Sequence, residues 1–343
     1  MNDPFGHGSL TDVQGVLVGH HQRSGSGWLT GTTVVFCPNG ATAAVDVRGG
    51  GPGTRETDAL DAHNLVDRIH AVCLSGGSAY GLATADGVMA ELERRHLGVP
   101  VGRDPHQVVP VVPTAVIFDL GRGGRFDRRP TADFGARALR AARRSPRRGS
   151  VGAGTGARAG GLRGGVGMAS TRVAIDGTSV TVAAIAVLNA AGSPVDVSTG
   201  LPWTRVDGVR RPTSSERRAV AEALGDPAGS LNTTIGLVAT DAVIERPEAK
   251  RMAMAAHDGL GRAVRPAHGL TDGDTIFAIS TGAHAIGGDR DGLARTATSR
   301  VAALNAISAA AAQVFEIACV DALLTASSSG DLLAYLDLCP PTS

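Results

Sequence analysis

The chain has 343 residues, of which 43% are hydrophobic, and a formal net charge of +1. These values predict a folded protein with one large domain or two ordinary ones. The balanced charge gives no global argument for a nucleic-acid or membrane partner, and we expect neither. Aromatic residues make up only 3% of the chain while 47 residues are glycine, so the core must consist of closely packed small aliphatic side chains.

The cysteines and histidines do not indicate a metal or redox site. The four cysteines have neither metal-ligand nor redox spacing, and the ten histidines form no His-x-x-x-His or His-Glu pair. We therefore expect no metal and no cofactor. The N-terminal residues lack the basic and apolar regions of a secretory signal, which favours a cytoplasmic location. The apolar stretch 301–326 contains Glu316 and Asp321, which favour a buried helix over a membrane span.

The first third of the chain predicts several strands and one helix. Short apolar runs predict strands at residues 16–18, 32–36, 43–47, 69–74 and 108–120. The Gly-rich segment 48–54 predicts a tight loop. Ser78 is predicted to be the N-cap of a helix that extends to about His96.

Ten arginines lie between residues 121 and 150, in a background of small residues. A solvated helix with flanking loops is the first interpretation of this segment. A local acidic partner or a neighbouring subunit is the alternative.

The remaining elements predict a fold with segregated strands and helices. Strands are predicted at residues 170–176, 179–189, 234–240 and 275–280, with a hairpin turn at Asp176-Gly177. Residues 192–230 form a long loop with one short helix, and loops of this length are usually functional. Helices are predicted at 246–264 and from 295 to about 326. This order predicts an α+β protein with stacked, mainly antiparallel sheets covered by helices.

The Asn232-Thr233 dipeptide stands directly before a β-branched strand. If the peptide bond before Thr233 were cut, this residue would supply both a hydroxyl nucleophile and an α-amine base. The ordinary interpretation is a strand start, because β-branched residues favour strands. The dipeptide alone favours that ordinary interpretation.

Two other motifs fail as catalytic or nucleotide signatures. Gly152-Ala-Gly-Thr-Gly156 is not followed by the Lys-Ser/Thr pair of a phosphate-binding loop. We interpret it as backbone that packs too closely for side chains, and Gly154 as a residue that lines the substrate site. Ser78 does not lie in a Gly-x-Ser-x-Gly elbow, so beyond its capping role we expect it, with Tyr80, to line the site.

Eight segments in order along the chain resemble the DmpA-like family of L-aminopeptidase/D-esterases, which includes the β-peptidyl aminopeptidases. The segments are residues 15–20, 46–57, 74–82, 152–156, 164–167, 186–190, 232–241 and 272–277. The resemblance implies a single four-layer α-β-β-α domain over residues 1–343. It also implies self-cleavage into an α chain, 1–232, and a β chain, 233–343, and a homo-oligomer, with a tetramer favoured.

The resemblance also implies roles for individual residues. Thr233 aligns with the family nucleophile, with Ser230 as a rival start of the β chain. Asn189 matches the family asparagine that helps to hold the oxyanion. Asp274 falls where relatives carry a carboxylate and Asp272 where they carry a serine; either is a candidate for binding the substrate ammonium.

The predicted function is that of a self-processing aminopeptidase that acts on small peptides, amides or esters through an acyl-enzyme. One alternative is an acyltransferase of the same architecture, similar to ornithine acetyltransferase. The other alternative is a non-enzymatic small-molecule-binding protein on this scaffold.

Overall fold

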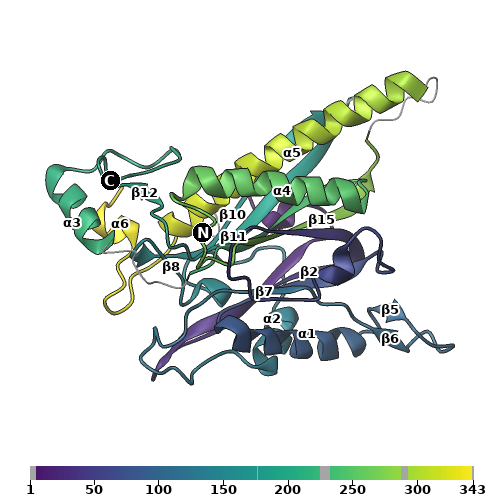
Figure 1. Ribbon diagram of the computed structural model, residues 1–343, viewed down its shortest axis with the longest axis horizontal. Helices are drawn as coiled ribbons and strands as arrows, with labels where there is room; N and C mark the ends of the chain where they lie inside the picture. The colour runs from purple at the N-terminus through teal and green to yellow at the C-terminus, as the bar shows by residue number, and fades with distance from the viewer. Residues whose placement is uncertain (1–4, 176, 225–231, 287–292, 342–343) are drawn as a thin grey trace.

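The computed structural model describes residues 5–175, 177–224, 232–286 and 293–341, without the side chains of 293–298. In these residues two sheets lie face to face, and helices cover the outer face of each (Figure 1). The protein is therefore a four-layer α-β-β-α sandwich, and the expected α+β class is confirmed.

The first sheet is built around the N-terminal half of a very long strand, β2 (Trp28–Val47). This half pairs antiparallel with both β1 (Leu17–Gly25) and β4 (Ile69–Ser75). Beyond β4 lie β7 (Thr114–Val116), which runs parallel to it, and β3 (Thr54–Arg55).

The second sheet contains the strands that position the site. Its order is β10 (Gly165–Ile175), β11 (Thr178–Leu188), β14 (Ile235–Ala242), β15 (Thr275–His284) and the C-terminal half of β2. β10 and β11 pair antiparallel as far as Ile175 and Thr178, which confirms the predicted hairpin, although Asp176 lies outside the described residues. β14 and β15 run parallel, with Ile235 opposite Thr275.

β2 belongs to both sheets, so the separate strands predicted at 32–36 and 43–47 are one strand. Its register shifts between Phe36 and Ala41, across Pro38 and Gly40, and Gly40 has a φ of 72°. These turn-forming residues bend the strand without ending it. The strand thereby passes from one layer to the next.

Two further predictions of secondary structure are wrong. Ser78 is not the N-cap of an α-helix: it has a φ of 51° and begins a 3-10 helix, Ser78–Ala83, after Gly77. Its backbone N–H donates to the carbonyl of Ile117, and α1 (Thr84–Glu93) begins only after that helix. The predicted strand 108–120 is also two short strands, because Pro110 and Pro113 interrupt the backbone hydrogen bonding.

Three apolar clusters fill the spaces between the four layers. Alternate residues of each strand face opposite sides, so Val238 packs toward the outer helices while Leu237 packs between the sheets. The third cluster joins Val34 and Cys73 of the first sheet to Val88 of α1. Small side chains predominate throughout, as the composition predicts.

Two helices cover each outer face. α1 and α2 (Ala132–Arg140) pack on the first sheet, and α4 (Arg246–Ala263) and α5 (Leu293–Leu324) pack on the second (Figure 1). Among the described residues, the segment Ser299–Leu324 of α5 is long and apolar enough to cross a membrane, but 72% of its apolar window is buried inside the protein. That burial is typical of a core helix.

Smaller elements complete the fold. The remaining strands form three two-stranded pairs: β5 (Val99–Pro100) with β6 (Val108–Val109), β8 (Arg158–Ala159) with β9 (Leu162–Arg163), and β12 (Val195–Asp196) with β13 (Leu201–Pro202). The remaining helices are α3 (Ser214–Leu224), α6 (Tyr335–Leu338) and the short 3-10 helices Leu10–Asp12, Asp58–Leu60 and Gly152–Gly154. α3 and α6 lie together near the C-terminus (Figure 1).

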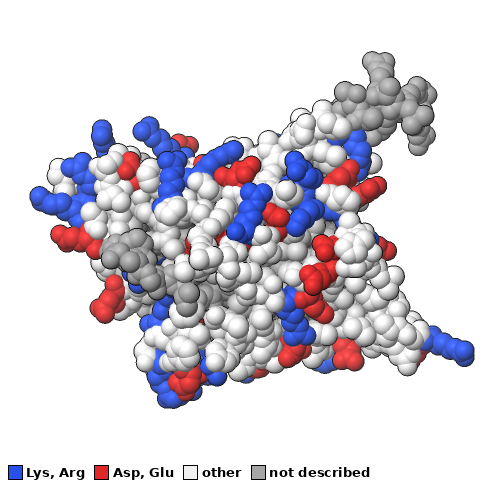
Figure 2. All heavy atoms as spheres, viewed as in Figure 1, with Lys and Arg blue, Asp and Glu red and all other residues white. Residues whose placement is uncertain are grey.

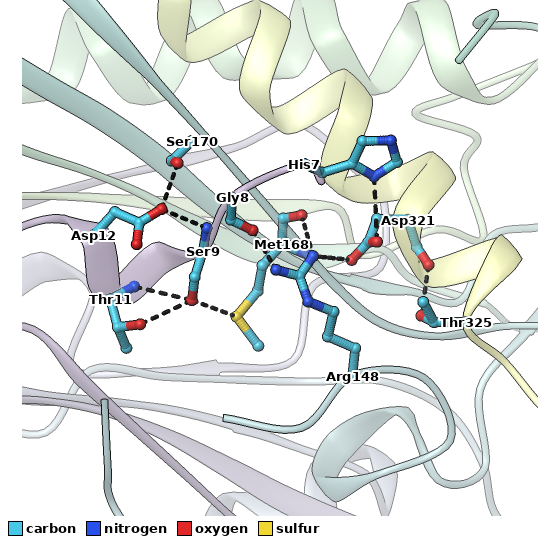
Figure 3. Close-up of polar contacts among 10 residues, drawn as sticks. All are labelled: His7, Gly8, Ser9, Thr11, Asp12, Arg148, Met168, Ser170, Asp321 and Thr325. Atoms are coloured by element: carbon cyan, nitrogen blue, oxygen red, sulfur yellow. Dashed lines mark hydrogen bonds and ion pairs between the residues drawn. The ribbon is translucent and has the colours of Figure 1, made fainter. Parts of the chain in front are cut away.

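A buried ion pair ties distant parts of the chain together (Figure 3). Asp321 of α5 is fully buried and accepts hydrogen bonds from the Arg148 guanidinium at 2.7 Å and from the Met168 backbone N–H at 2.8 Å. His7 Nδ1 lies 3.3 Å from the same carboxylate. The N-terminal segment, β10 and α5 therefore meet at one charged centre.

The outer surface carries both signs of charge. Figure 2 shows Lys and Arg side chains interspersed with Asp and Glu on the visible face. Several arginines of segment 121–150 make local contacts, such as Arg137 with Asp133 and Arg140 with Glu91. α2 lies in this segment and buries Phe134 and Leu139, while its Arg137 and Arg140 side chains are more than half exposed, so part of the segment is the solvated helix that we predicted.

Candidate active site

Thr233 lies directly before β14, between the two neighbouring strands of the second sheet. Its side chain is only 6% exposed, and its hydroxyl donates a hydrogen bond to the carbonyl oxygen of Asn232. The backbone N–H of Gly273 donates to Thr233 Oγ1 at 3.0 Å. The hydroxyl is thus held against the carbonyl group of the peptide bond that precedes it.

The strands on either side fix the backbone around Thr233. From β11, the Asn189 carbonyl accepts the Thr233 N–H at 2.5 Å. From the turn before β15, Asp274 Oδ1 accepts the Thr234 N–H at 2.8 Å, and Asn232 forms a backbone bridge to Asp272. The geometry therefore depends on three segments that are far apart in the sequence.

Asn189 is completely buried, and two donors orient its side-chain amide. Its Oδ1 accepts from Arg122 Nη1 at 2.5 Å and from the Arg158 backbone N–H at 3.1 Å. Its Nδ2 has no hydrogen-bond partner among the described residues. A buried donor without a partner is costly in a folded protein, and here it leaves an N–H available to a bound group.

Arg122 connects this asparagine to the candidate cleavage site, and our sequence analysis did not single it out. Its guanidinium donates to the Gly156 carbonyl at 2.7 Å, to Asn189 Oδ1 and to Asn232 Oδ1 at 3.0 Å. Burial lowers its pKa to about 10, while the Asp119 carboxylate acts in the opposite direction. Arg122 therefore stays positively charged at neutral pH.

Asp119 is a second buried site residue that the sequence did not indicate. Burial raises the pKa of its carboxyl to about 6, and its Oδ1 accepts the Gly77 N–H at 2.7 Å. A Cβ atom at Gly76 would lie 2.1 Å from this carboxylate, and one at Gly156 would lie 2.8 Å from it. Two of the Gly-rich motifs therefore make room for one carboxylate.

The two candidate carboxylates have different environments. Asp274 is saturated with donors, because its Oδ1 accepts from Thr234 and its Oδ2 accepts the His268 backbone N–H at 3.0 Å and lies 2.8 Å from His268 Nδ1. Asp272 accepts the Gly269 N–H at 3.0 Å. Burial and, second, the negative charge of Asp274 raise the pKa of Asp272 to about 6.

The Gly-rich loop 48–54 packs against Gly273, which lies next to Thr233. A Cβ atom on Gly273 would lie 2.6 Å from the Gly51 carbonyl and 3.0 Å from Thr233 Oγ1. Only glycine therefore lets the 272–274 turn pass between this loop and Thr233.

The other predicted substrate-binding residues have contacts elsewhere. Gly154 is buried, and a Cβ atom on it would lie 2.5 Å from the Gly165 carbonyl carbon. Tyr80 is 53% exposed, and the Arg129 guanidinium lies 3.6 Å from its ring centre. Ser78 follows Gly77, which binds Asp119. No hydrogen bond in the described part of the chain joins these three residues to Thr233 or Asn189.

A pocket of about 440 Å³ opens beside Arg122. Its wall includes Arg158 as well as Trp28, Leu29 and Asp331. The pocket thus lies next to the two residues that orient the Asn189 amide. Ser230, the rival first residue of a β chain, lies outside the described residues. Within the described residues, no group of three or more His, Cys, Asp or Glu side chains is arranged to hold a metal ion.

The fold agrees with that of a solved peptidase. The L-aminopeptidase D-Ala-esterase/amidase of Ochrobactrum anthropi superposes with a TM-score of 0.72 at 21% identity, over 97% of this chain and 92% of that one. Its structure is described as a new variant of the N-terminal-nucleophile hydrolase fold. That fold is the class to which the present architecture belongs.

The sequence defines the family within that class. The profile of peptidase family S58 matches residues 8–331. An uncharacterised aminopeptidase of Mycobacterium tuberculosis is 46% identical, over 97% of this chain and 98% of its own length. A 6-aminohexanoate-oligomer endohydrolase of a Kocuria species is 34% identical, over 79% of this chain and 74% of its own. The chain belongs to peptidase family S58, which confirms the resemblance and makes it a hydrolase.

Proposed function

We propose that this chain is a self-processing aminopeptidase whose nucleophile is Thr233. The observation that carries the proposal is the placement of Thr233 Oγ1 between the Asn232 carbonyl and the Gly273 N–H. An ordinary strand start requires neither contact. The aminopeptidase names of close relatives support the same activity.

Self-cleavage would proceed by an N→O acyl shift. The Thr233 hydroxyl attacks the Asn232 carbonyl carbon, the C–N bond breaks, and the hydroxyl proton moves to the departing Thr233 nitrogen. Water then hydrolyses the ester. The products are an α chain that ends at Asn232 and a β chain that begins with a free Thr233 amine.

In the mature enzyme the same residue would act on substrate. An unperturbed α-amine has a pKa of about 7.7–8.0, so it serves as the general base near neutral pH. Thr233 Oγ1 attacks the first amide or ester of the substrate, and the Asn189 Nδ2 donor stabilises the oxyanion. The amine passes the proton to the leaving group, and water releases the acyl group.

Of the two carboxylates, we assign Asp272 to the substrate ammonium. Asp274 is already engaged by Thr234 and His268, which suits it to hold the backbone of β14. Asp272 has fewer hydrogen-bond donors and bridges to the Asn232 backbone, so it lies where a substrate amino terminus would enter. The homo-oligomeric state and the cytoplasmic location stay predictions from the sequence.

Intact mass measurement and N-terminal sequencing of the purified protein test this proposal. We expect two polypeptides, the smaller of which begins at Thr233, and the complex of the two should hydrolyse alanyl p-nitroanilide. Thr233→Ala should leave an uncut and inactive chain, whereas Thr233→Ser should restore cleavage. Ser230→Ala is the matched control and should be processed normally. A Thr233→Ala protein that is still cut would contradict the assignment.

A further inference from the structure

We propose that the subsite for the substrate's acyl residue, the residue whose carbonyl is attacked, selects an N-terminal aspartyl residue. This proposal rests on the proposed function and specifies its substrate class. Asn232 is the acyl residue of the chain's own scissile bond. Thr233 attacks its carbonyl in the same way as it attacks a substrate carbonyl. The groups that hold the Asn232 side chain therefore indicate what the subsite recognises.

One contact that holds this side chain is polar and buried. Asn232 is 3% exposed, and its Oδ1 accepts from Arg122 Nη2 at 3.0 Å. The other terminal nitrogen of Arg122 is fixed by Gly156 and Asn189. The guanidinium is thus rigidly placed to receive an oxygen on Cγ, the third carbon from the reacting carbonyl carbon. An aspartyl or asparaginyl side chain carries its oxygen at that position.

The charge around the subsite favours a carboxylate over a carboxamide. Burial is the main cause of the lowered pKa of Arg122; the positive charges of Arg158 and Arg163 lower it further, and the Asp119 carboxylate opposes them. Arg122 and Arg158 also line the 440 Å³ pocket, which has one acidic residue in its wall, Asp331. Hydrogen bonds between guanidinium and carboxylate are stronger than neutral ones.

Asp272, across the subsite from Arg122, is the group that we assign to the substrate ammonium. The Asp272 backbone pairs with the Asn232 backbone, so residue 272 lies beside the position that the ammonium of a substrate's N-terminal residue would take when its side chain reaches Arg122. An α-linked aspartyl residue satisfies both contacts. An isoaspartyl residue presents the same carboxylate but carries its ammonium one carbon farther from the carbonyl.

The test compares kcat/KM of the processed enzyme on p-nitroanilides of aspartate, asparagine, alanine and leucine, together with β-linked aspartyl p-nitroanilide. We expect the α-aspartyl compound to exceed the alanyl one by about tenfold or more, as one charge-assisted hydrogen bond allows. Arg158→Gln keeps the backbone N–H to Asn189 and removes one positive charge. It should lower the aspartyl-to-asparaginyl ratio mainly through KM.

Self-cleavage provides a second measurement that needs no added substrate. Asn232→Asp should be cut at a rate similar to that of the natural chain, and Asn232→Leu, which has no oxygen for Arg122, should be cut about tenfold more slowly or worse. Equal kcat/KM on all α-linked anilides would overturn the aspartyl assignment and leave the Thr233 mechanism intact. A chain that is uncut and inactive on every anilide would overturn both.

Discussion

Thr233 has Asp274 on one side, the carboxylate side, and Asn189 and Arg122 on the other, the arginine side. Both sides are polar and buried, but their hydrogen-bonding groups are satisfied to different degrees. On the carboxylate side, Asp274 is satisfied by Thr234 and His268. On the arginine side, Asn189 keeps an amide nitrogen without a partner among the described residues, and Arg122 borders an open pocket. A group whose hydrogen bonds are all formed stabilises the backbone, whereas a donor without a partner can form a hydrogen bond with a bound ligand. The comparison is between Asp274, which supports the backbone, and Asn189, whose available N–H suits it to the proposed reaction.

The largest effect should come from removing the unsatisfied donor. Asn189→Ala should lower kcat on alanyl p-nitroanilide by roughly 10²- to 10³-fold with little change in KM, because the donor acts on the developing oxyanion. Self-cleavage should slow as well. Intact mass measurement should therefore detect both the uncut and the cleaved form of this variant. A normal kcat in Asn189→Ala would contradict the proposed role of Asn189 in stabilising the oxyanion.

Breaking the saturated side should affect stability more than chemistry. Asp274→Ala leaves the Thr234 and His268 N–H groups unpaired, and a buried donor without a partner costs about 1–3 kcal/mol. We expect a loss of that size in the free energy of unfolding, measured by urea denaturation in the uncut Thr233→Ala background. Asp331→Ala, at the pocket wall, is the matched surface control and should change stability by less than about 0.5 kcal/mol.

The pH profile distinguishes the two carboxylates. The pKa of Asp272 is raised to about 6, chiefly by burial, so this group is ionised above pH 6 and protonated below it. If its charge holds the substrate ammonium, log kcat/KM should rise with slope one between pH 6 and 8, where the Thr233 amine titrates. Below pH 6 the slope should approach two.

Asp272→Asn is the control for that profile. It should remove the steeper limb and leave a slope of one down to pH 5, at a lower absolute rate. A wild-type profile without the second limb would assign the ammonium to another group.

The smallest effect should come from substitutions of Tyr80, which belongs to neither the carboxylate side nor the arginine side. Its contact with Arg129 is largely solvent-exposed, and such cation–π pairs contribute about 0.5–1 kcal/mol. Tyr80→Phe keeps the ring and Tyr80→Ala removes it. We expect both variants to be processed normally, with a change of less than about threefold in kcat/KM. A large decrease in kcat/KM for Tyr80→Ala but not for Tyr80→Phe would show that the Tyr80 ring belongs to the substrate site.

The sequence predicts the layered architecture well because strands and helices have different hydrophobic periods. β11, β14 and α4 lie close to their expected bounds, and β10 ends as expected but begins at Gly165 instead of at residue 170. The same reasoning misplaces the start of α1, since a helix cap depends on the backbone angles of Ser78, which side-chain patterns do not specify. It also divides β2, because the turn-forming residues bend the strand instead of ending it.

At the site, the residues near Thr233 could be inferred from the sequence, whereas the charged residues that support them could not. Asn189, Asp272 and Asp274 have local motifs, and all three contact Asn232, Thr233 or Thr234. Arg122 is one of ten arginines in segment 121–150, and nothing local distinguishes it from those on the surface. Its role depends on the folding of β11 and β14 against it, which is a property of the three-dimensional arrangement alone.

The position of β14 and β15 in the second sheet has a consequence for how the protein must be encoded. Residues 233–343 supply two strands that lie between β11 and β2, both of which belong to residues 1–232. Neither fragment alone can close that sheet, and each would expose unpaired strand edges. We expect separately translated fragments to aggregate before they meet. If the bond before Thr233 is cut as we propose, that bond is needed only while the sheet assembles, and we expect efficient assembly only when both halves are translated as one chain.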